Sequence, residues 1–340
     1  MNQSPATRLS SVGPRGVRLA GTGVYLPRRA VTNDELAKTV DTNDEWISKR
    51  TGIRQRRIAD EDETIRLMAR ESIRMALDNA GLAGSDLDFV IVATLTPEMV
   101  TPSTAACVTT DLGAAPAGAV DISAACSGYV YALNMAWALI KSGVCNTVAV
   151  AGTEKLSAIT NWKDRNTCVL FGDGGGAAIL TASDDPEQGS IYQTMHSDAA
   201  KSGELYVPRC ERDLPPGDQI FTGEYNTLQM NGREIYKFAV HTLQDSIDKA
   251  LAACGLKPSD LAMIIPHQMN ARILESAREK LGLSSEKLYV NIDRYGNTSA
   301  ASVAICLHEL MAAGRLHQGD LVLFIGLGGG LTWATNLWRV

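Results

Sequence analysis

Ala-Leu-Asp-Asn-Ala-Gly-Leu-Ala-Gly-Ser-Asp-Leu-Asp-Phe-Val-Ile, at residues 76–91, recurs as Ala-Leu-Ala-Ala-Cys-Gly-Leu-Lys-Pro-Ser-Asp-Leu-Ala-Met-Ile-Ile at residues 250–265. The two stretches align without a gap at an offset of 174 residues, close to half of the 340-residue chain, with eight identical positions. Each is typical of an amphipathic helix that ends at glycine, a short Ser-Asp loop and an apolar strand. This order is common in α/β proteins, but a gapless match of this length favours an internal duplication.

Strand-like and helix-like stretches alternate along the rest of the chain, which predicts sheets covered by helices. Further strands are expected at residues 118–122, 147–151, 177–180, 288–292 and 321–326. The polar segment 182–189 separates an N-terminal half, residues 16–183, from a C-terminal half, residues 184–340. Residues 1–15 are expected to form a flexible tail, and residues 197–227 an irregular loop rich in charge, Gly and Pro. The chain is therefore predicted to be an α/β protein of two similar halves.

Composition is that of an ordinary globular protein, with 45% hydrophobic and 21% charged residues and a net charge of −6. No apolar run has the length of a transmembrane helix, and the polar N-terminus does not have the pattern of a signal peptide. The seven cysteines are odd in number and show no CxxC spacing, which argues against a disulfide framework or zinc site and favours the reducing cytoplasm. The acidic charge gives no support to nucleic-acid or membrane binding.

Cys126 is the first candidate for chemistry. It follows the predicted strand 118–122 and directly precedes a helical stretch that begins at Gly128. A helix N-terminus stabilises a thiolate, and lowering the pKa of a free thiol from about 8.5 by about two units would leave most of it ionised at neutral pH. We therefore expect a reactive thiol with a lowered pKa. A buried structural cysteine is the alternative interpretation.

Three polar or glycine-rich motifs follow in the second half. His267 lies in Pro-His-Gln-Met-Asn, directly after the strand of the second repeat, where α/β proteins place functional residues. Asn297 lies in Tyr-Gly-Asn-Thr-Ser-Ala-Ala-Ser, a glycine turn that leads into a helix, and residues 325–332 end a strand in a run of glycines. Taken singly, these motifs are equally consistent with a structural histidine, a turn-forming asparagine and a hairpin. The glycine run lacks the Lys-Ser/Thr of a phosphate loop.

Taken together, Ala-Ala-Cys-Ser-Gly, Pro-His-Gln-x-Asn and Tyr-Gly-Asn-Thr-Ser-Ala-Ala-Ser resemble the motifs of 3-oxoacyl-[acyl-carrier-protein] synthase III. This family contains the ketosynthases that initiate type II fatty acid synthesis. The resemblance runs from about residue 17 to residue 340 and includes residues 41–53 and Phe-Gly-Asp-Gly at 171–174. It implies a thiolase-like fold, in which two duplicated α/β halves form five layers, α-β-α-β-α.

The resemblance also implies a mechanism that needs no metal or cofactor, with acyl-CoA and malonyl-carrier thioester as substrates. Cys126 would take the acyl group as a thioester. His267 and Asn297 would stabilise the enolate formed when the malonyl group loses carbon dioxide, and a neutral His267 would donate from Nε2. The backbone N–H groups of Cys126 and Gly329 would hold the second oxyanion.

Substrate-binding residues are implied in the same way. Those expected to bind CoA are Thr42, Trp46, Arg50, Arg165, Met230, Gly232 and Asn270. Those expected to meet the acyl carrier protein are Arg233, Lys237, Gln268 and Arg272. Thr101 and Leu327 are assigned to the acyl pocket. Thr101 stands where short-chain members of the family often carry an aromatic residue that caps the pocket, so longer acyl primers than acetyl are open to this protein. Leu327 replaces a phenylalanine common near the cysteine, which bears on the geometry of decarboxylation. A homodimer is expected as well.

Three alternatives stay open from the residues alone. The first is a related thiolase-fold acyltransferase or condensing enzyme of secondary metabolism that uses a longer acyl donor. The second is a cysteine thioester hydrolase, in which His267 would activate the thiol of Cys126 and water would release a free acid. The third is a non-catalytic CoA-binding protein, against which the complete set of Cys126, His267 and Asn297 argues.

Overall fold

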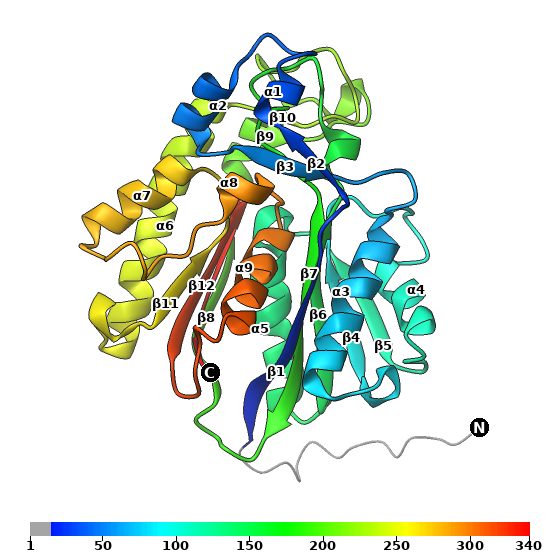
Figure 1. Cartoon of the computed structure of the whole chain (residues 1–340), viewed down its shortest axis with the longest axis vertical. Coiled ribbons are helices and arrows are strands. Elements are labelled where there is room, and N and C mark those ends of the chain that lie inside the picture. The colour runs from blue at the N-terminus through cyan, green and yellow to red at the C-terminus, as the bar shows by residue number, and fades with distance from the viewer. Residues whose placement is uncertain (1–14) are drawn as a thin grey trace.

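Two β-sheets, of five and four strands, form the core of this computed structural model, which describes residues 15–340, and four strands follow the same order in both (Figure 1). The first sheet has the order β1-β7-β6-β4-β5 and the second the order β8-β13-β12-β11. In the first sheet, the repeated strand β4 pairs in parallel with β6, which pairs antiparallel with β7. In the second, the repeated strand β11 pairs in parallel with β12, which pairs antiparallel with β13. The strands of the first sheet are β1 (Gly16–Tyr25), β4 (Phe89–Ala93), β5 (Gly118–Ile122), β6 (Thr147–Glu154) and β7 (Gly174–Ser183). Those of the second are β8 (Gly189–Ser197), β11 (Met263–Pro266), β12 (Leu321–Gly328) and β13 (Thr332–Arg339).

Helices lie between the two sheets and on both outer faces, which makes five layers (Figure 1). Helices α5 (Gly128–Lys141) and α9 (Ala301–Ala312) pack between the sheets, so they are apolar on most sides. Helices α3 (Ile65–Ala80) and α4 (Thr104–Asp111) cover the first sheet, and α6 (Gly232–Cys254) and α7 (Ala271–Lys280) cover the second. The predicted α-β-α-β-α arrangement of duplicated halves is confirmed.

The repeated stretch forms the same local structure in each half. Helix α3 ends at Gly81 and helix α6 at Gly255, with φ values of 68° and 65° that favour glycine. A short 3₁₀ turn then leads into β4 or β11. The N-caps also correspond, since Thr64 accepts a hydrogen bond from the backbone of α3 and Asn231 from that of α6. Capping residues thus set both ends of the helix in each repeat.

The remaining elements surround the upper end of the layers in Figure 1. They are α1 (Asn33–Leu36), α2 (Asp44–Thr51), α8 (Ile292–Tyr295), β2 (Arg29–Thr32), β3 (Gln55–Ile58), β9 (Leu205–Tyr206) and β10 (Gln229–Met230). The strand expected at 288–292 is wrong: Leu288 forms only an isolated bridge with Ile264, and the chain then turns into α8. The segment 197–227 is irregular apart from β9 and short 3₁₀ turns.

The predicted N-terminal tail and the predicted division into two halves both stay predictions. The expected tail lies outside the described residues except for Arg15, and the division at 183/184 falls in the connection between β7 and β8. That division into halves stays an interpretation. Within residues 15–340, no helix combines the length and the apolarity needed to span a bilayer.

Candidate active site

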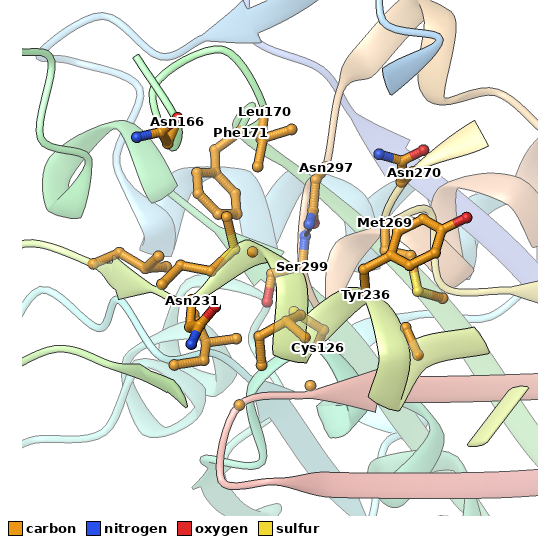
Figure 2. Close-up of a pocket in the computed structure, with 18 of the residues that line it drawn as sticks. Cys126, Asn166, Leu170, Phe171, Asn231, Tyr236, Met269, Asn270, Asn297 and Ser299 are labelled. Carbon is orange, nitrogen blue, oxygen red and sulfur yellow. Dashed lines mark hydrogen bonds between the residues drawn. The ribbon is translucent and has the colours of Figure 1, made fainter. Parts of the chain in front are cut away.

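A cavity of about 1110 Å³ opens between the ends of the two sheets and the irregular segment that covers them. Its walls come from both halves of the chain, and Cys126, His267 and Asn297 all line it. Figure 2 shows Asn297 and Ser299 above Cys126, with Phe171, Asn231 and Tyr236 around them. The three residues expected to do the chemistry are therefore brought together, although 171 positions separate the first from the last along the chain. Their catalytic roles stay predictions.

Cys126 lies in a 3₁₀ turn, Ala125–Ser127, that leads directly into α5. Gly328, at the end of β12, packs against this turn, and a Cβ atom there would lie 2.5 Å from the backbone nitrogen of Cys126. The glycine run therefore allows the second sheet to approach the nucleophile closely. Gly329 lines the cavity beside it, where its backbone was expected to help hold an oxyanion.

The ionisation expected for Cys126 is wrong for the resting protein. Desolvation at the base of the cavity raises the pKa of its thiol to about 12, with the nearby Glu154 adding to the rise and a hydrogen bond with Ser299 opposing it. A helix N-terminus contributes at most about 2 kcal/mol, which is less than this rise. The thiol is consequently neutral before substrate binds, because the loss of hydration outweighs the helix dipole.

His267 follows β11 directly and is 1% exposed. Burial lowers the pKa of its imidazole to about 3, so the side chain is neutral at physiological pH. Nδ1 lies 2.7 Å from the hydroxyl of Ser302, which also lies 2.8 Å from the carbonyl oxygen of Ser299. The single hydroxyl hydrogen of Ser302 is donated either to the carbonyl oxygen of Ser299, in which case Nδ1–H donates to Ser302, or to Nδ1. Only the second arrangement leaves the imidazole proton on Nε2, the form in which that nitrogen is a hydrogen-bond donor.

Asn297 is held by its backbone and its side-chain oxygen. Its N–H donates to the carbonyl oxygen of Leu170 at 2.8 Å, and its Oδ1 accepts a hydrogen bond from the backbone of Ser299 at 2.9 Å. With Oδ1 engaged, the amide NH₂ is the group that faces the cavity. Asn297 and, in its Nε2–H form, His267 are thus two uncharged donors in the cavity that holds the Cys126 thiol, which is the arrangement needed to stabilise a developing oxyanion.

A tryptophan between two arginines stands at the mouth of the cavity. The guanidinium groups of Arg50 and Arg165 each lie 4.9 Å from the centre of the Trp46 ring. All three residues line the cavity, whereas Thr42 does not, and its buried hydroxyl has no hydrogen-bond partner within the described chain. The indole of Trp46 is thus in contact with two guanidinium groups, so an adenine that stacks on it lies beside two cations.

The other residues expected to bind CoA line the same cavity. Met230 lies in β10, Gly232 begins α6, and Asn270 precedes α7. The side chain of Asn270 is already engaged, because it accepts from the backbone of Arg272 at 2.9 Å and donates to the carbonyl of Arg50 at 3.1 Å. Asn270 therefore ties the start of α7 to the end of α2.

Basic residues gather at the opening. Arg233, Lys237 and Arg272 line the cavity, and Arg209, from the irregular segment, joins them. Lys237 is paired with Glu234 at 2.5 Å across a turn of α6, and its side chain remains 56% exposed. A cluster of this kind is suited to an acidic partner. Arg209 carried no motif and could not be assigned from sequence.

Gln268 is not part of this surface, and its assignment to carrier binding is a correction. The side chain is 1% exposed. Its amide donates to the carbonyl oxygens of Pro266 and Tyr289, and its oxygen accepts from the backbone of Asn291. All of its hydrogen-bonding groups are consumed inside the protein, so Gln268 supports the loop behind His267.

The two residues assigned to the acyl pocket separate in the structure. Leu327 lines the cavity and is 3% exposed. Thr101 is exposed in the loop before α4 and does not line the cavity of its own chain, so its assignment to the acyl pocket stays a prediction. The β4–α4 connection turns outward, leaving Val100 89% exposed.

Several cavity residues were missed from the sequence. Ser299 and Phe171 lie inside motifs that were noted for other residues. The signal available in the sequence was their position within those motifs. Tyr236 and Met269 also line the cavity in Figure 2, on segments next to predicted residues. Their contribution depends on which face of α6 or of the loop points inward, and that follows from packing.

Comparisons with known proteins agree with this site. Profiles of 3-oxoacyl-[acyl-carrier-protein (ACP)] synthase III and of its C-terminal part match residues 120–199 and 251–340. The chain is 46% identical over 319 residues to beta-ketoacyl-[acyl-carrier-protein] synthase III of Caldanaerobacter subterraneus subsp. tengcongensis, covering 94% of this chain and 96% of that protein. The Aquifex aeolicus 3-oxoacyl-[acyl-carrier-protein] synthase III structure superposes with a TM-score of 0.89 at 45% identity, covering 96% of this chain and 100% of the other.

A second solved structure broadens the comparison. The priming beta-ketosynthase from the R1128 polyketide biosynthetic pathway superposes with a TM-score of 0.88 at 35% identity, and the match covers 99% of each chain. Full-length matches at these identities extend well beyond the active-site motifs. With the cavity and its three polar residues in place, they show that the chain belongs to the 3-oxoacyl-[acyl-carrier-protein] synthase III family.

Proposed function

We propose that this protein condenses an acyl-CoA primer with malonyl-acyl carrier protein, releasing CoA and carbon dioxide and forming a 3-oxoacyl-carrier product. This reaction initiates type II fatty acid synthesis. The observation that carries the proposal is the convergence of the Cys126 thiol, a neutral His267 and the free amide of Asn297 at the base of one cavity. No cofactor is required, because a thioester and a decarboxylation supply the reactive groups.

In the first half-reaction, the sulfur of Cys126 attacks the thioester carbonyl of acyl-CoA, and the CoA thiol leaves. Backbone N–H groups of Cys126 and Gly329 stabilise the tetrahedral oxyanion. In the second, loss of carbon dioxide from the malonyl group gives an enolate, which accepts hydrogen bonds from His267 and Asn297. Its carbon attacks the acyl-Cys126 thioester and frees the thiolate, which regains a proton.

The low pKa of His267 favours this mechanism over thioester hydrolysis. A hydrolase of the Cys-His type needs a histidine that accepts the thiol proton, and an imidazole with a pKa of about 3 is a poor acceptor at neutral pH. The same property suits enolate stabilisation, since a neutral donor does not protonate the carbanion. We therefore place His267 in the second half-reaction.

A longer or different acyl primer is the second candidate. The cavity is large, and Thr101 does not close it within its own chain. The similarity to the priming ketosynthase of a polyketide pathway also favours a condensing enzyme of secondary metabolism. A series of acyl-CoAs offered to the protein, with the Cys126 adducts weighed by intact mass spectrometry, distinguishes the two candidates.

The partners follow from the same surfaces. We propose that Arg209, Arg233, Lys237 and Arg272 receive the acidic carrier protein. We also propose a homodimer, because β5 is an edge strand of the first sheet and the neighbouring loop exposes apolar Val100. The seven cysteines, all free in the structure, fit the cytoplasm.

The function is tested by separating the two half-reactions. Incubation with acyl-CoA alone should add the acyl mass to the wild type and to Cys107→Ala, which changes a cysteine outside the cavity, but not to Cys126→Ala. His267→Ala and Asn297→Ala should still be acylated, while release of carbon dioxide from malonyl-carrier falls by about 10²–10³. If His267→Ala condenses normally but is not acylated, the roles are reversed and the hydrolase mechanism is favoured.

A further inference from the structure

Glu154 is a buried acidic residue next to the reactive cysteine with no role in the chemistry above. It ends β6 and is 0% exposed. Oε2 accepts hydrogen bonds from the backbone of Leu95 and the hydroxyls of Thr94 and Thr96, at 2.9–3.2 Å. No salt bridge within residues 15–340 involves it. A buried carboxyl without a cation can bind a proton readily.

Ser299 connects this carboxyl to the nucleophile. Its hydroxyl donates to Oε1 of Glu154 at 3.1 Å, and Figure 2 shows Ser299 above Cys126, whose thiol pKa it lowers. A serine hydroxyl has one hydrogen, so while it donates to Glu154 only its oxygen lone pairs are available to the thiol. Ser299 is held in this position with φ of 48°, a left-handed conformation that is rare outside glycine, by the hydrogen bond of its N–H to Asn297.

The ionisation of Glu154 affects the ionisation of Cys126. Burial raises the pKa of Glu154 to about 7, and the charge of Glu154 is among the causes that raise the pKa of Cys126. A thiolate beside an ionised Glu154 is therefore disfavoured, whereas a thiolate beside a neutral Glu154 avoids the repulsion. His267 cannot take the proton in its place, because burial lowers its pKa to about 3.

We propose that Glu154 receives the proton of the Cys126 thiol through the hydroxyl of Ser299. The S–H bond breaks as Ser299 Oγ takes the proton, and the hydroxyl passes its own proton to Oε1 of Glu154, which becomes a neutral carboxylic acid. The thiolate then attacks the acyl-CoA thioester. The proton returns through Ser299 to the departing CoA sulfur, so Glu154 is ionised again and no further acid or base is needed.

This inference rests on the proposed acylation of Cys126, but its ionisation step is tested without it. Iodoacetamide alkylates only the thiolate, so the rate at which Cys126 gains the carbamidomethyl group, followed by peptide mass spectrometry, reports its ionisation. In the wild type the logarithm of this rate should rise with pH until about 7, where Glu154 loses its proton, and then stay level. Above pH 7 the pair of groups holds a single proton, and the division of that proton between Glu154 and Cys126 does not depend on pH.

Two variants remove the relay in different ways. Glu154→Gln keeps the size of the side chain but cannot accept a proton, and Ser299→Gly removes the hydroxyl while suiting the positive φ. In Glu154→Gln the rate should lose the break near pH 7 and increase about tenfold per pH unit up to the pKa of the thiol. Ser299→Gly should keep the break, because the equilibrium population of thiolate does not depend on the path of the proton, but it should be acylated by acyl-CoA more slowly than the wild type. Equal acylation rates in folded Ser299→Gly and the wild type overturn the relay. Asp173→Asn is the matched control, because Asp173 is also buried with a raised pKa but hydrogen-bonds to Ser157 and Ala59 instead.

The control should keep the wild-type break, and near-ultraviolet circular dichroism should show that each variant is folded. A wild-type rate that climbs without a break, or a break that persists in folded Glu154→Gln, overturns the proposal. Acylation by acyl-CoA is then measured on the same proteins. If the break is present in alkylation but no acyl-enzyme ever forms, the proposed function fails while the proton relay stands.

Discussion

Replacing Glu154 by glutamine should make the protein more stable at alkaline pH than at acid pH, relative to the wild type. In the folded protein the carboxyl has a pKa of about 7, whereas the ordinary value is 4.5. Between these values the folded state keeps a proton that the unfolded chain has released. Stability from this group is therefore complete below pH 4.5 and is lost as the pH rises through 7.

The shift sets the magnitude. One pKa unit corresponds to about 1.4 kcal/mol, so the wild type should lose up to about 3 kcal/mol of unfolding free energy across this range through Glu154 alone. Glutamine does not titrate. Its carbonyl can accept from Leu95, Thr94 and Thr96, and its NH₂ can donate to the hydroxyl of Ser299, so the buried hydrogen bonds survive the change.

The measurement is urea unfolding of both proteins at several pH values from about 4.5 to 8, with the difference in unfolding free energy taken at each pH. Other titrating groups, including buried His267, cancel in that difference. Glu309→Gln is the control with a pKa shift of opposite sign, because hydrogen bonds from Arg294, Asn291 and Tyr295 outweigh burial and hold the pKa of Glu309 below its ordinary value. The stability that ionised Glu309 contributes is lost only as the pH falls below about 4.5, so the Glu309→Gln difference should stay nearly level from pH 4.5 to 8. A Glu154→Gln difference that does not change with pH would refute the reasoning.

Other variants test the binding and orienting residues. Trp46→Ala should raise the KM for acyl-CoA with little effect on kcat in steady-state kinetics, because an indole flanked by two arginines is lost. Leu327→Phe adds a ring to the cavity wall, where overpacking costs about 1–3 kcal/mol, so kcat/KM should fall more for long acyl chains than for acetyl-CoA. Thr101→Phe should not change that ratio if the cavity belongs to one chain, and a change would show that the loop reaches the cavity of another copy. Ser302→Ala removes the contact with His267 Nδ1, so the ¹⁵N resonances of the imidazole should shift and condensation should slow while acylation persists; unchanged resonances would contradict a tautomer set by Ser302.

The sequence was sufficient for the architecture because its signals are local. The repeat at residues 76–91 and 250–265 carries its own helix ends in Gly81 and Gly255, and the alternation of apolar strands and helices predicts the layers. The motifs around Cys126, His267 and Asn297 likewise identified residues that the cavity brings together. The strand expected at 288–292 failed because an apolar run shows that a segment is buried but not how far it pairs.

Only the tertiary structure decided the environment of each side chain. The sequence placed Cys126 at a helix start and so predicted a lowered pKa, whereas the surrounding protein removes water from the thiol and raises it. Gln268 stands next to a cavity residue in the chain but points into the protein, and Thr101 points out of it. Ser299 and Glu154 are 145 positions apart, so their hydrogen bond to one another left no trace in spacing. Desolvation and through-space contact depend on what packs around a group, and that is set by the fold of the whole chain rather than by its neighbours in sequence.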